Sequence, residues 1–317
     1  MSNIKLSVIV PTYNHEKYIE ECINSILMQK VDFEYEVLIG EDCSTDDTAN
    51  VLRRIEQRLP SNYYVFYREK NLGVGVDGNV RELQSRARGK YVITIEGDDY
   101  LVYEHKLQKQ VDFLEENDDV YAVAHYCQVV DENSIRNGEK YPNCKDSEYT
   151  IKHYLERVMP GQLATIVYRN TFYDIETFFY EKYMMYDYYP GDRLNAFLML
   201  TQGKYVCMPE EWSAYRHVTS SGTSYSARVK VDKKFKMNEM LFYKSIYSYA
   251  KDNNKKEVEI VTGKLYFFSC FKRAIEKDTG ISFGKWIKEV FKEKFSGRYI
   301  VYILKQTLTS MLNKLKA

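Results

Sequence analysis

The first hundred residues alternate short apolar segments with amphipathic segments, and this alternation limits the possible folds more than any other feature of the chain. The apolar segments are rich in Val, Ile, Leu and Tyr, and each precedes a stretch with helical spacing of apolar residues. We expect strands at 6–10, 35–39, 63–67 and 91–95, and helices at 16–28, 46–58 and 79–88. This order predicts an α/β fold with a mainly parallel sheet flanked by helices.

Beyond residue 100 the alternation of expected strands and helices becomes less regular. We expect helices at 104–116, 151–157, 171–179 and 192–201, a strand at 121–130, short strands among the later helices, and mostly helical structure from 229. From Lys264 to the end there are twelve Lys and Arg against four Asp and Glu, so a basic tail follows an acidic body. The division that we expect is 1–100 and 101–225 as two halves of one domain, with 226–317 as a basic helical extension.

Composition narrows the functional classes. Formal charge is zero, with 45 basic and 45 acidic residues, which gives no reason to expect a nucleic-acid partner. The six scattered cysteines show no zinc spacing, the N-terminus has no signal-peptide pattern, and no apolar run is long enough to cross a bilayer. We therefore expect free thiols and a cytoplasmic location.

Two adjacent carboxylates, Asp98 and Asp99, directly follow the strand expected at 91–95. In open α/β sheets, ligands gather at the carboxyl ends of the strands. Acidic residues there can hold Mg²⁺ or Mn²⁺, which would neutralise a diphosphate. The alternative is a solvated turn in which an Asp caps the next helix.

The ends of the first two strands carry aromatic, amide and acidic residues. Pro11-Thr-Tyr-Asn14 stands where a dinucleotide-binding fold would have G-x-G-x-x-G, so the sequence weighs against a dehydrogenase. Glu41 and Asp42 end the second strand, and a carboxylate there could accept a hydrogen bond from the N–H of a uracil ring. The Ser-Thr-Asp residues that follow are explained by helix capping.

Three blocks occur in order at the expected strand ends: V-I-V-P-T-Y-N-H, E-D-C-S-T-D-D-T and R-A-R-G-K-Y-V-I-T-I-E-G-D-D-Y. Together they resemble the inverting glycosyltransferases of family 2 over residues 4–130, with weaker similarity to about 220. The resemblance implies a GT-A-like fold, a nucleotide-sugar donor such as a UDP-sugar bound by the 1–100 half, and an acceptor bound by the 101–225 half. Relatives of this kind act in bacterial surface-polysaccharide synthesis, as in capsules.

The resemblance also implies roles for single residues. Positions that hold the base and ribose of the donor are matched by Pro11, Tyr13 and Asp42. The metal-binding element is matched by Asp98 and Asp99, with Asp99 as the direct ligand and Asp98 nearer the ribose or the donor sugar.

Two further segments resemble the family less closely. Pro190-Gly-Asp-Arg-Leu194 places Asp192 as the catalytic base, although the family more often has Glu-Asp where this chain has Gly-Asp. Tyr215-Arg-His217 resembles a Tyr-Arg-x-His element that contacts the donor phosphates, but His217 follows Arg216 directly. Alternatively, Asp192 caps a helix, Arg216 is a surface cation and His217 is a packed or surface imidazole.

The tail at 283–315 interleaves apolar residues with Lys and Arg. Such a helix can lie on an anionic membrane, or its apolar face can pack on the rest of the protein. Taken together, the sequence predicts metal-dependent inverting sugar transfer to a saccharide or lipid-linked saccharide, with peripheral contact at the cytoplasmic membrane surface as one expectation. The alternative function is a non-catalytic nucleotide- or sugar-binding module on the same fold.

Overall fold

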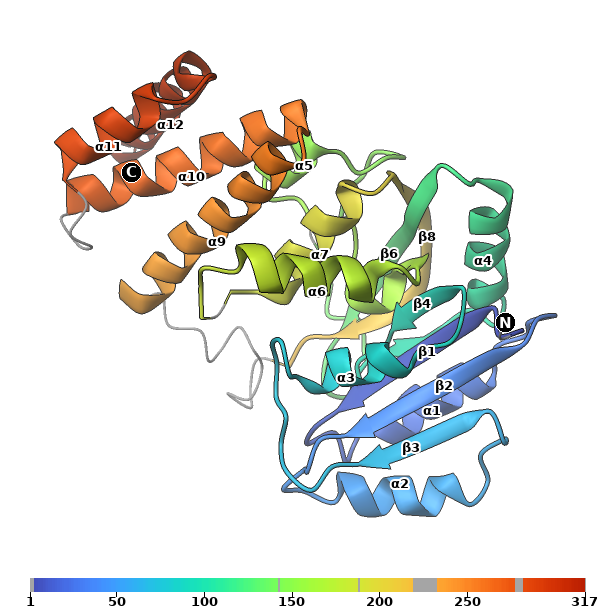
Figure 1. Ribbon diagram of the computed structural model, residues 1–317. Helices are drawn as coiled ribbons and strands as arrows, with labels where there is room; N and C mark the ends of the chain where they lie inside the picture. Colours follow the sequence, from blue (N-terminus) through green and yellow to red (C-terminus); the bar gives the residue numbers. More distant parts are fainter. Residues whose placement is uncertain (1–2, 142, 188, 219–232, 277–281, 317) are drawn as a thin grey trace. The chain divides into compact units, whose positions relative to one another are not determined.

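The computed structural model describes residues 3–141, 143–187, 189–218, 233–276 and 282–316 (Figure 1). The chain forms two compact units. The first comprises Met1–Thr177 with Gly191–Arg228, and the second comprises Phe178–Pro190 with Val229–Ala317. Phe178–Pro190, which falls within the expected 101–225 half, belongs to the second unit.

The first unit is built on one eight-stranded sheet with the order β3-β2-β1-β4-β7-β6-β8-β5. Its strands are β1 (Leu6–Thr12), β2 (Tyr35–Glu41), β3 (Tyr63–Tyr67), β4 (Tyr91–Thr94), β5 (Tyr100–Leu101), β6 (Val120–Val130), β7 (Val167–Arg169) and β8 (Lys204–Arg216). The first four run parallel to one another, β7 is antiparallel to β4 and β6, and β8 is parallel to β6. The predicted α/β class, with a mainly parallel sheet, is confirmed.

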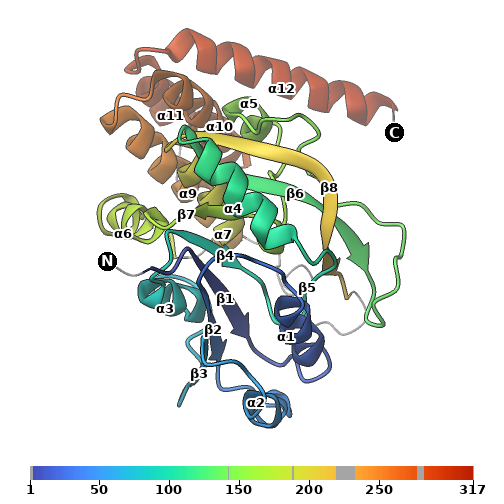
Figure 2. The same ribbon diagram turned by 90° about the vertical axis from the view of Figure 1, so that its right-hand side faces the viewer.

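Helices cover both faces of this sheet (Figure 2). The helices are α1 (Ile19–Leu27), α2 (Thr48–Glu56), α3 (Asn79–Arg86), α4 (Lys106–Glu116), α5 (Ile151–Leu155) and α7 (Gly191–Leu200). The apolar sides of α1, α2 and α4 share one core with Leu6, Val8 and Val10 of β1, whereas α3 packs against β1 and β2. Because β1 is covered on both faces, nearly all of its residues are buried, which explains its continuous apolar run.

Expected and observed elements agree best in the first hundred residues, where β3 has the expected bounds. The largest difference is β8, a thirteen-residue strand in a region where we expected only short strands among helices. Helix α6 (Phe172–Tyr183) also extends beyond its expected end.

The second unit is helical, with α9 (Lys233–Asp252), α10 (Lys256–Glu276), α11 (Phe283–Phe291) and α12 (Ser296–Lys316). Its core gathers aromatic side chains from all four helices, including Tyr247, Phe267, Trp286 and Tyr299. Within the described part of the chain, no helix has the length and apolarity that crossing a bilayer requires.

Candidate active site

The carboxyl ends of β1, β2 and β4 meet at one edge of the sheet, as the sequence predicted for parallel strands. The backbone N–H of Asp42 donates to the Thr12 carbonyl at 3.0 Å, and that of Gly97 donates to the Pro11 carbonyl at 3.0 Å. A Cβ at Gly97 would lie 2.7 Å from Thr12 Oγ1, so only glycine allows the loop after β4 to pass this close to β1.

Asp99 is a buried carboxylate that the protein itself satisfies. Its side chain is 1% exposed, Oδ1 accepts the backbone N–H of Arg216 at 2.8 Å, and Oδ2 accepts from Gln162 Nε2. Burial, together with the nearby charges of Asp98 and Glu96, holds the pKa of Asp99 well above its usual value. These hydrogen bonds hold the loop after β4 in place.

Asp98 differs from its neighbour because its side chain is 33% exposed, with Oδ2 3.7 Å from His15 Nε2. Among the described residues there is no cluster of three or more His, Cys, Asp or Glu side chains that would enclose a metal ion. Mg²⁺ is commonly held by one or two carboxylates plus substrate phosphates and water. Asp98 fits that kind of site better than Asp99, although the sequence favoured Asp99.

Glu96 is a site residue that our sequence reasoning missed. Burial and the charges of Asp98 and Asp192 raise the pKa of Glu96 to about 8. A signal was available, because Glu96 is the third carboxylate of the E-G-D-D block. The loop after β4 therefore carries three acidic residues, and the charge of Asp98 acts on both Glu96 and Asp99.

Asp192 lies in the first turn of α7, and the fold brings it into electrostatic reach of this loop. Its charge contributes to the raised pKa values of Glu96, Tyr141 and Tyr215. Asp192 is an exposed residue. The protein around its carboxyl group nevertheless desolvates the charged form, and this raises the pKa of Asp192 above its usual value. An exposed carboxylate with a raised pKa is suited to accept a proton.

Asp42 is buried and joins β2 to the loop at 71–78. Its Oδ1 accepts the backbone N–H of Leu72 at 2.7 Å, and its Oδ2 accepts that of Gly73 at 2.9 Å. A carboxylate has about four acceptor positions, so these two bonds leave capacity for a ligand. Pro11 and Tyr13 lie partly buried at the adjacent end of β1.

Arg216, at the end of β8, is not the surface cation of the alternative interpretation, because its side chain is 1% exposed. Its Nε donates to the Asp98 carbonyl and its Nη1 to the Asp131 carbonyl, both at 2.9 Å. Its Nη2 pairs with Glu21 Oε2 at 2.6 Å. The guanidinium thus ties three segments together next to the carboxylates.

His217 contacts Glu139 and Tyr215. Its Nδ1 lies 2.6 Å from Glu139 Oε2, and its ring stacks on Tyr215 with centroids 6.1 Å apart. The sequence-derived phosphate contact of His217 stays a prediction.

Comparisons with known proteins identify the family and the fold that this chain is similar to. The model of the family described as "Glycosyl transferase family 2" matches residues 7–179. An uncharacterized protein of Mycobacterium tuberculosis is 31% identical over 164 residues, which are 52% of this chain and 46% of that protein. The poly(ribitol-phosphate) beta-N-acetylglucosaminyltransferase TarS of Staphylococcus aureus is 41% identical over 118 residues, which are 36% of this chain and 19% of TarS. The match with the first of these relatives thus spans about half of its length.

Solved structures of S. aureus TarS 1–349 are similar in fold. The complex with UDP has a TM-score of 0.58 and 21% identity, covering 95% of this chain and 81% of that chain. The complex with UDP-GlcNAc has a TM-score of 0.57 and 21% identity, covering 94% and 79%. The GT-A-like fold predicted from the sequence is confirmed.

Proposed function

Because this chain belongs to glycosyl transferase family 2, we propose that it is an enzyme that transfers a sugar from a UDP-sugar to a saccharide acceptor with inversion. The observation that carries this proposal is that the charge of Asp192, in the first turn of α7, acts on Glu96 in the loop after β4, where the charge of Asp98 also acts. Asp192 is almost a hundred positions from Glu96 and Asp98 along the chain. A helix cap alone would not require Asp192 to lie within electrostatic reach of Glu96.

Asp192 is the proposed base. It takes the proton of the acceptor hydroxyl while that oxygen forms a bond to the anomeric carbon of the donor sugar. The bond from this carbon to the diphosphate breaks on the opposite face, and the nucleoside diphosphate leaves with the electron pair. The exposure of Asp192 lets an acceptor reach it, and its raised pKa makes it a stronger base than an ordinary Asp.

The donor end of the site is assigned to the strand ends of β1, β2 and β4. Asp98 would hold Mg²⁺ or Mn²⁺, and such a cation would neutralise charge on the leaving diphosphate. Pro11, Tyr13 and Asp42 are proposed to contact the base and ribose. Arg216 is proposed to position the Asp98 loop.

The helix α12 supports a further part of the proposal, contact with an anionic membrane. Its inner face, with Tyr299 and Ile303, is buried in the core of the second unit. A second apolar stripe is 49–67% exposed and consists of Val301, Leu304, Leu308 and Leu312. The helix carries four basic and no acidic residues. The two alternatives for the tail are therefore compatible, because one face packs while the other is available for lipid.

The acceptor is proposed to be a saccharide, free or lipid-linked, used at the cytoplasmic face of the membrane. The UDP and UDP-GlcNAc complexes of TarS support a uridine donor. The direct test measures nucleotide release from UDP-, GDP- and dTDP-sugars with Mn²⁺ or Mg²⁺. We expect turnover of a UDP-sugar. Turnover of a GDP- or dTDP-sugar alone would contradict the uridine assignment, and UDP binding without turnover across an acceptor panel would favour a binding module.

A further inference from the structure

A pocket of about 340 Å³ lies on the first unit beside β6, and it is lined by that strand, by residues of 136–141 and 143–145, and by Glu211 of β8. This volume falls within the usual range of small-molecule sites. Resting on the proposed function, we propose that the pocket is the acceptor subsite and that it binds a saccharide carrying an anionic group, a phosphate or a carboxylate.

One residue of the wall, Tyr141, connects the pocket to the proposed catalytic carboxylates. Tyr141 lines the pocket, and the charges of Asp192 and Glu96 act on its hydroxyl. Its ring also packs edge-on against Tyr215, with centroids 5.5 Å apart, directly before Arg216. A sugar in this pocket would therefore contact Tyr141, whose hydroxyl lies within electrostatic reach of Asp192.

The charges of the wall are unequally balanced. Arg136 pairs with Glu211 at 2.9 Å, and Glu139 pairs with His217 at 2.6 Å. Two more cations, Lys140 and Lys145, line the pocket, and neither has an ion pair or a side-chain hydrogen bond within the described residues. Three cations of the wall, Arg136, Lys140 and Lys145, stand against two carboxylates, Glu139 and Glu211, so the wall carries a net charge of +1. Lysine ammonium groups bind phosphate and carboxylate as point charges.

The remaining wall suits the neutral part of a sugar. Tyr126 and Tyr141 offer aromatic faces for the C–H side of a sugar ring, and Gln128 and Asn143 offer amides for its hydroxyl groups. Glu211 enters the wall where β8 is irregularly paired with β6, since the register shifts on both sides of Tyr126.

The test uses glucose 6-phosphate, glucuronate and glucose as probes of the full-length protein with UDP and Mg²⁺ present. Saturation-transfer NMR, with titration of each sugar, measures binding. We expect both charged sugars to bind about tenfold more tightly than glucose, and this preference to shrink with added salt. Changing both lysines, Lys140→Ala with Lys145→Ala, should remove the preference, while Lys109→Ala, an exposed lysine on α4, should retain it.

Equal binding of glucose and the charged sugars by the wild type would overturn the proposal, as would an unchanged preference in the double variant. UDP affinity, measured on the same samples, separates this outcome from a failure of the proposed function. If UDP binds and a UDP-sugar is turned over while the lysines have no effect, the acceptor pocket is wrong and the transferase proposal stands. If UDP does not bind at all, the transferase proposal fails, and a charge preference removed by the lysine changes would still identify an anionic-sugar site.

Discussion

Asp99 Oδ1 accepts the backbone N–H of Arg216 at 2.8 Å, although 117 positions separate the two residues in the sequence. The bond joins the end of β8 to the loop after β4, so the Asp99 carboxylate stabilises the fold. Its neighbour Asp98 keeps a partly exposed carboxylate at the same loop. Two adjacent and chemically identical side chains therefore have different environments, and we expect different consequences when each is changed.

Asp98→Asn should weaken the cation-assisted binding of UDP while leaving the protein folded, because a partly exposed oxygen ligand is lost. Asp99→Asn should lower the free energy of unfolding by about 1–3 kcal/mol, because the new NH₂ group faces one of the two donors, Arg216 N–H or Gln162 Nε2, that Asp99 satisfied. Calorimetric titration of UDP with and without Mn²⁺, together with urea unfolding, measures both effects. If the two variants exchange these phenotypes, Asp99 is the cation ligand that the sequence favoured.

Arg216→Ala should destabilise the protein by roughly 2–4 kcal/mol, because it removes a buried guanidinium that holds the Asp98 and Asp131 carbonyls. Glu21→Gln should cost under about 1 kcal/mol, because the Glu21 side chain is partly exposed and its pair is screened. Urea unfolding of both single variants and the double variant gives these values. Weaker UDP binding of Arg216→Ala with unchanged stability would instead assign Arg216 to the donor phosphates.

The sequence was sufficient for the first half of the site and insufficient for the second. The strands β1, β2 and β4 are mostly apolar, so their carboxyl ends, with Asp42 and Asp98, could be located from pattern alone. Strand β8 mixes buried and exposed residues irregularly and contains Pro209-Glu-Glu, so no period of two marks it. The burial of Asp99 and Arg216 depends on contacts between distant segments, which local pattern does not report.

Lys106→Met should stabilise the protein by about 1–3 kcal/mol, because Lys106 is fully buried and its Nζ has no hydrogen-bond partner among the described residues. Burial holds the pKa of Lys106 well below its usual value. The wild type therefore loses stability as pH falls from the unfolded-state pKa toward the folded-state one, so the gain from Met should be larger at pH 7 than at pH 10. Urea unfolding at both pH values measures it, and a destabilised variant would show that the amine has an essential partner.

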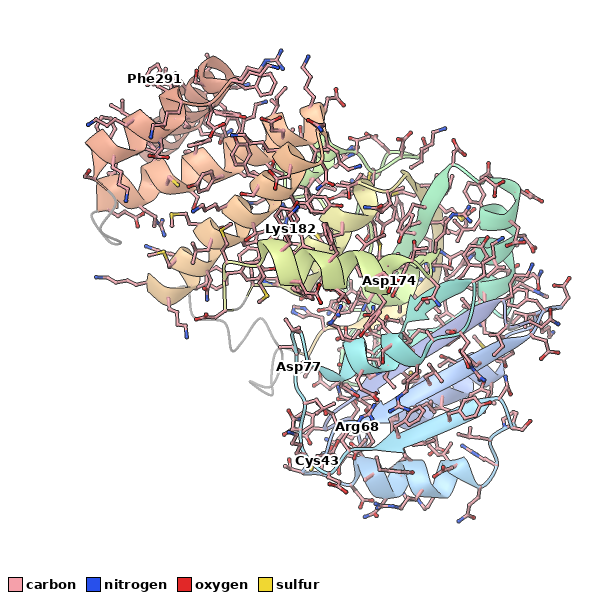
Figure 3. The ribbon with its side chains drawn as sticks, in the orientation of Figure 1. Cys43, Arg68, Asp77, Asp174, Lys182 and Phe291 are labelled. Carbon is pink, nitrogen blue, oxygen red and sulfur yellow. The ribbon has the colours of Figure 1, made fainter. Side chains whose placement is uncertain are left out.

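Replacing Leu304 and Leu308 by Ser should reduce co-sedimentation with vesicles containing phosphatidylglycerol, because these residues form the exposed stripe of α12. Phe291, exposed on α11 and labelled in Figure 3, is a second candidate for lipid contact. Ile275→Ser, at an exposed apolar position of α10, is the matched control. Equal binding to neutral vesicles would exclude an electrostatic contribution, and concentration-dependent dimers that the Leu changes abolish would assign the stripe to a second copy.

The pH dependence of turnover should carry the signature of Asp192. Its pKa is raised, and the base must be ionised, so kcat/KM should rise with pH through a midpoint above about 3.9, the ordinary value for Asp. Initial rates from acid to neutral pH, with UDP binding followed in parallel, measure this limb. A midpoint at or below the ordinary value would show that the titrating group is not the Asp192 of this site.

The central claim is most directly tested by comparing two first-turn aspartates in a UDP-sugar turnover assay with an accepted saccharide. Asp192 stands in the first turn of α7, and Asp174, exposed in the first turn of α6 (Figure 3), is its match. We predict that Asp192→Asn lowers kcat by about 10²–10⁴-fold while UDP affinity is retained, and that Asp174→Asn leaves kcat unchanged. An Asp192→Asn variant with wild-type kcat would contradict the account.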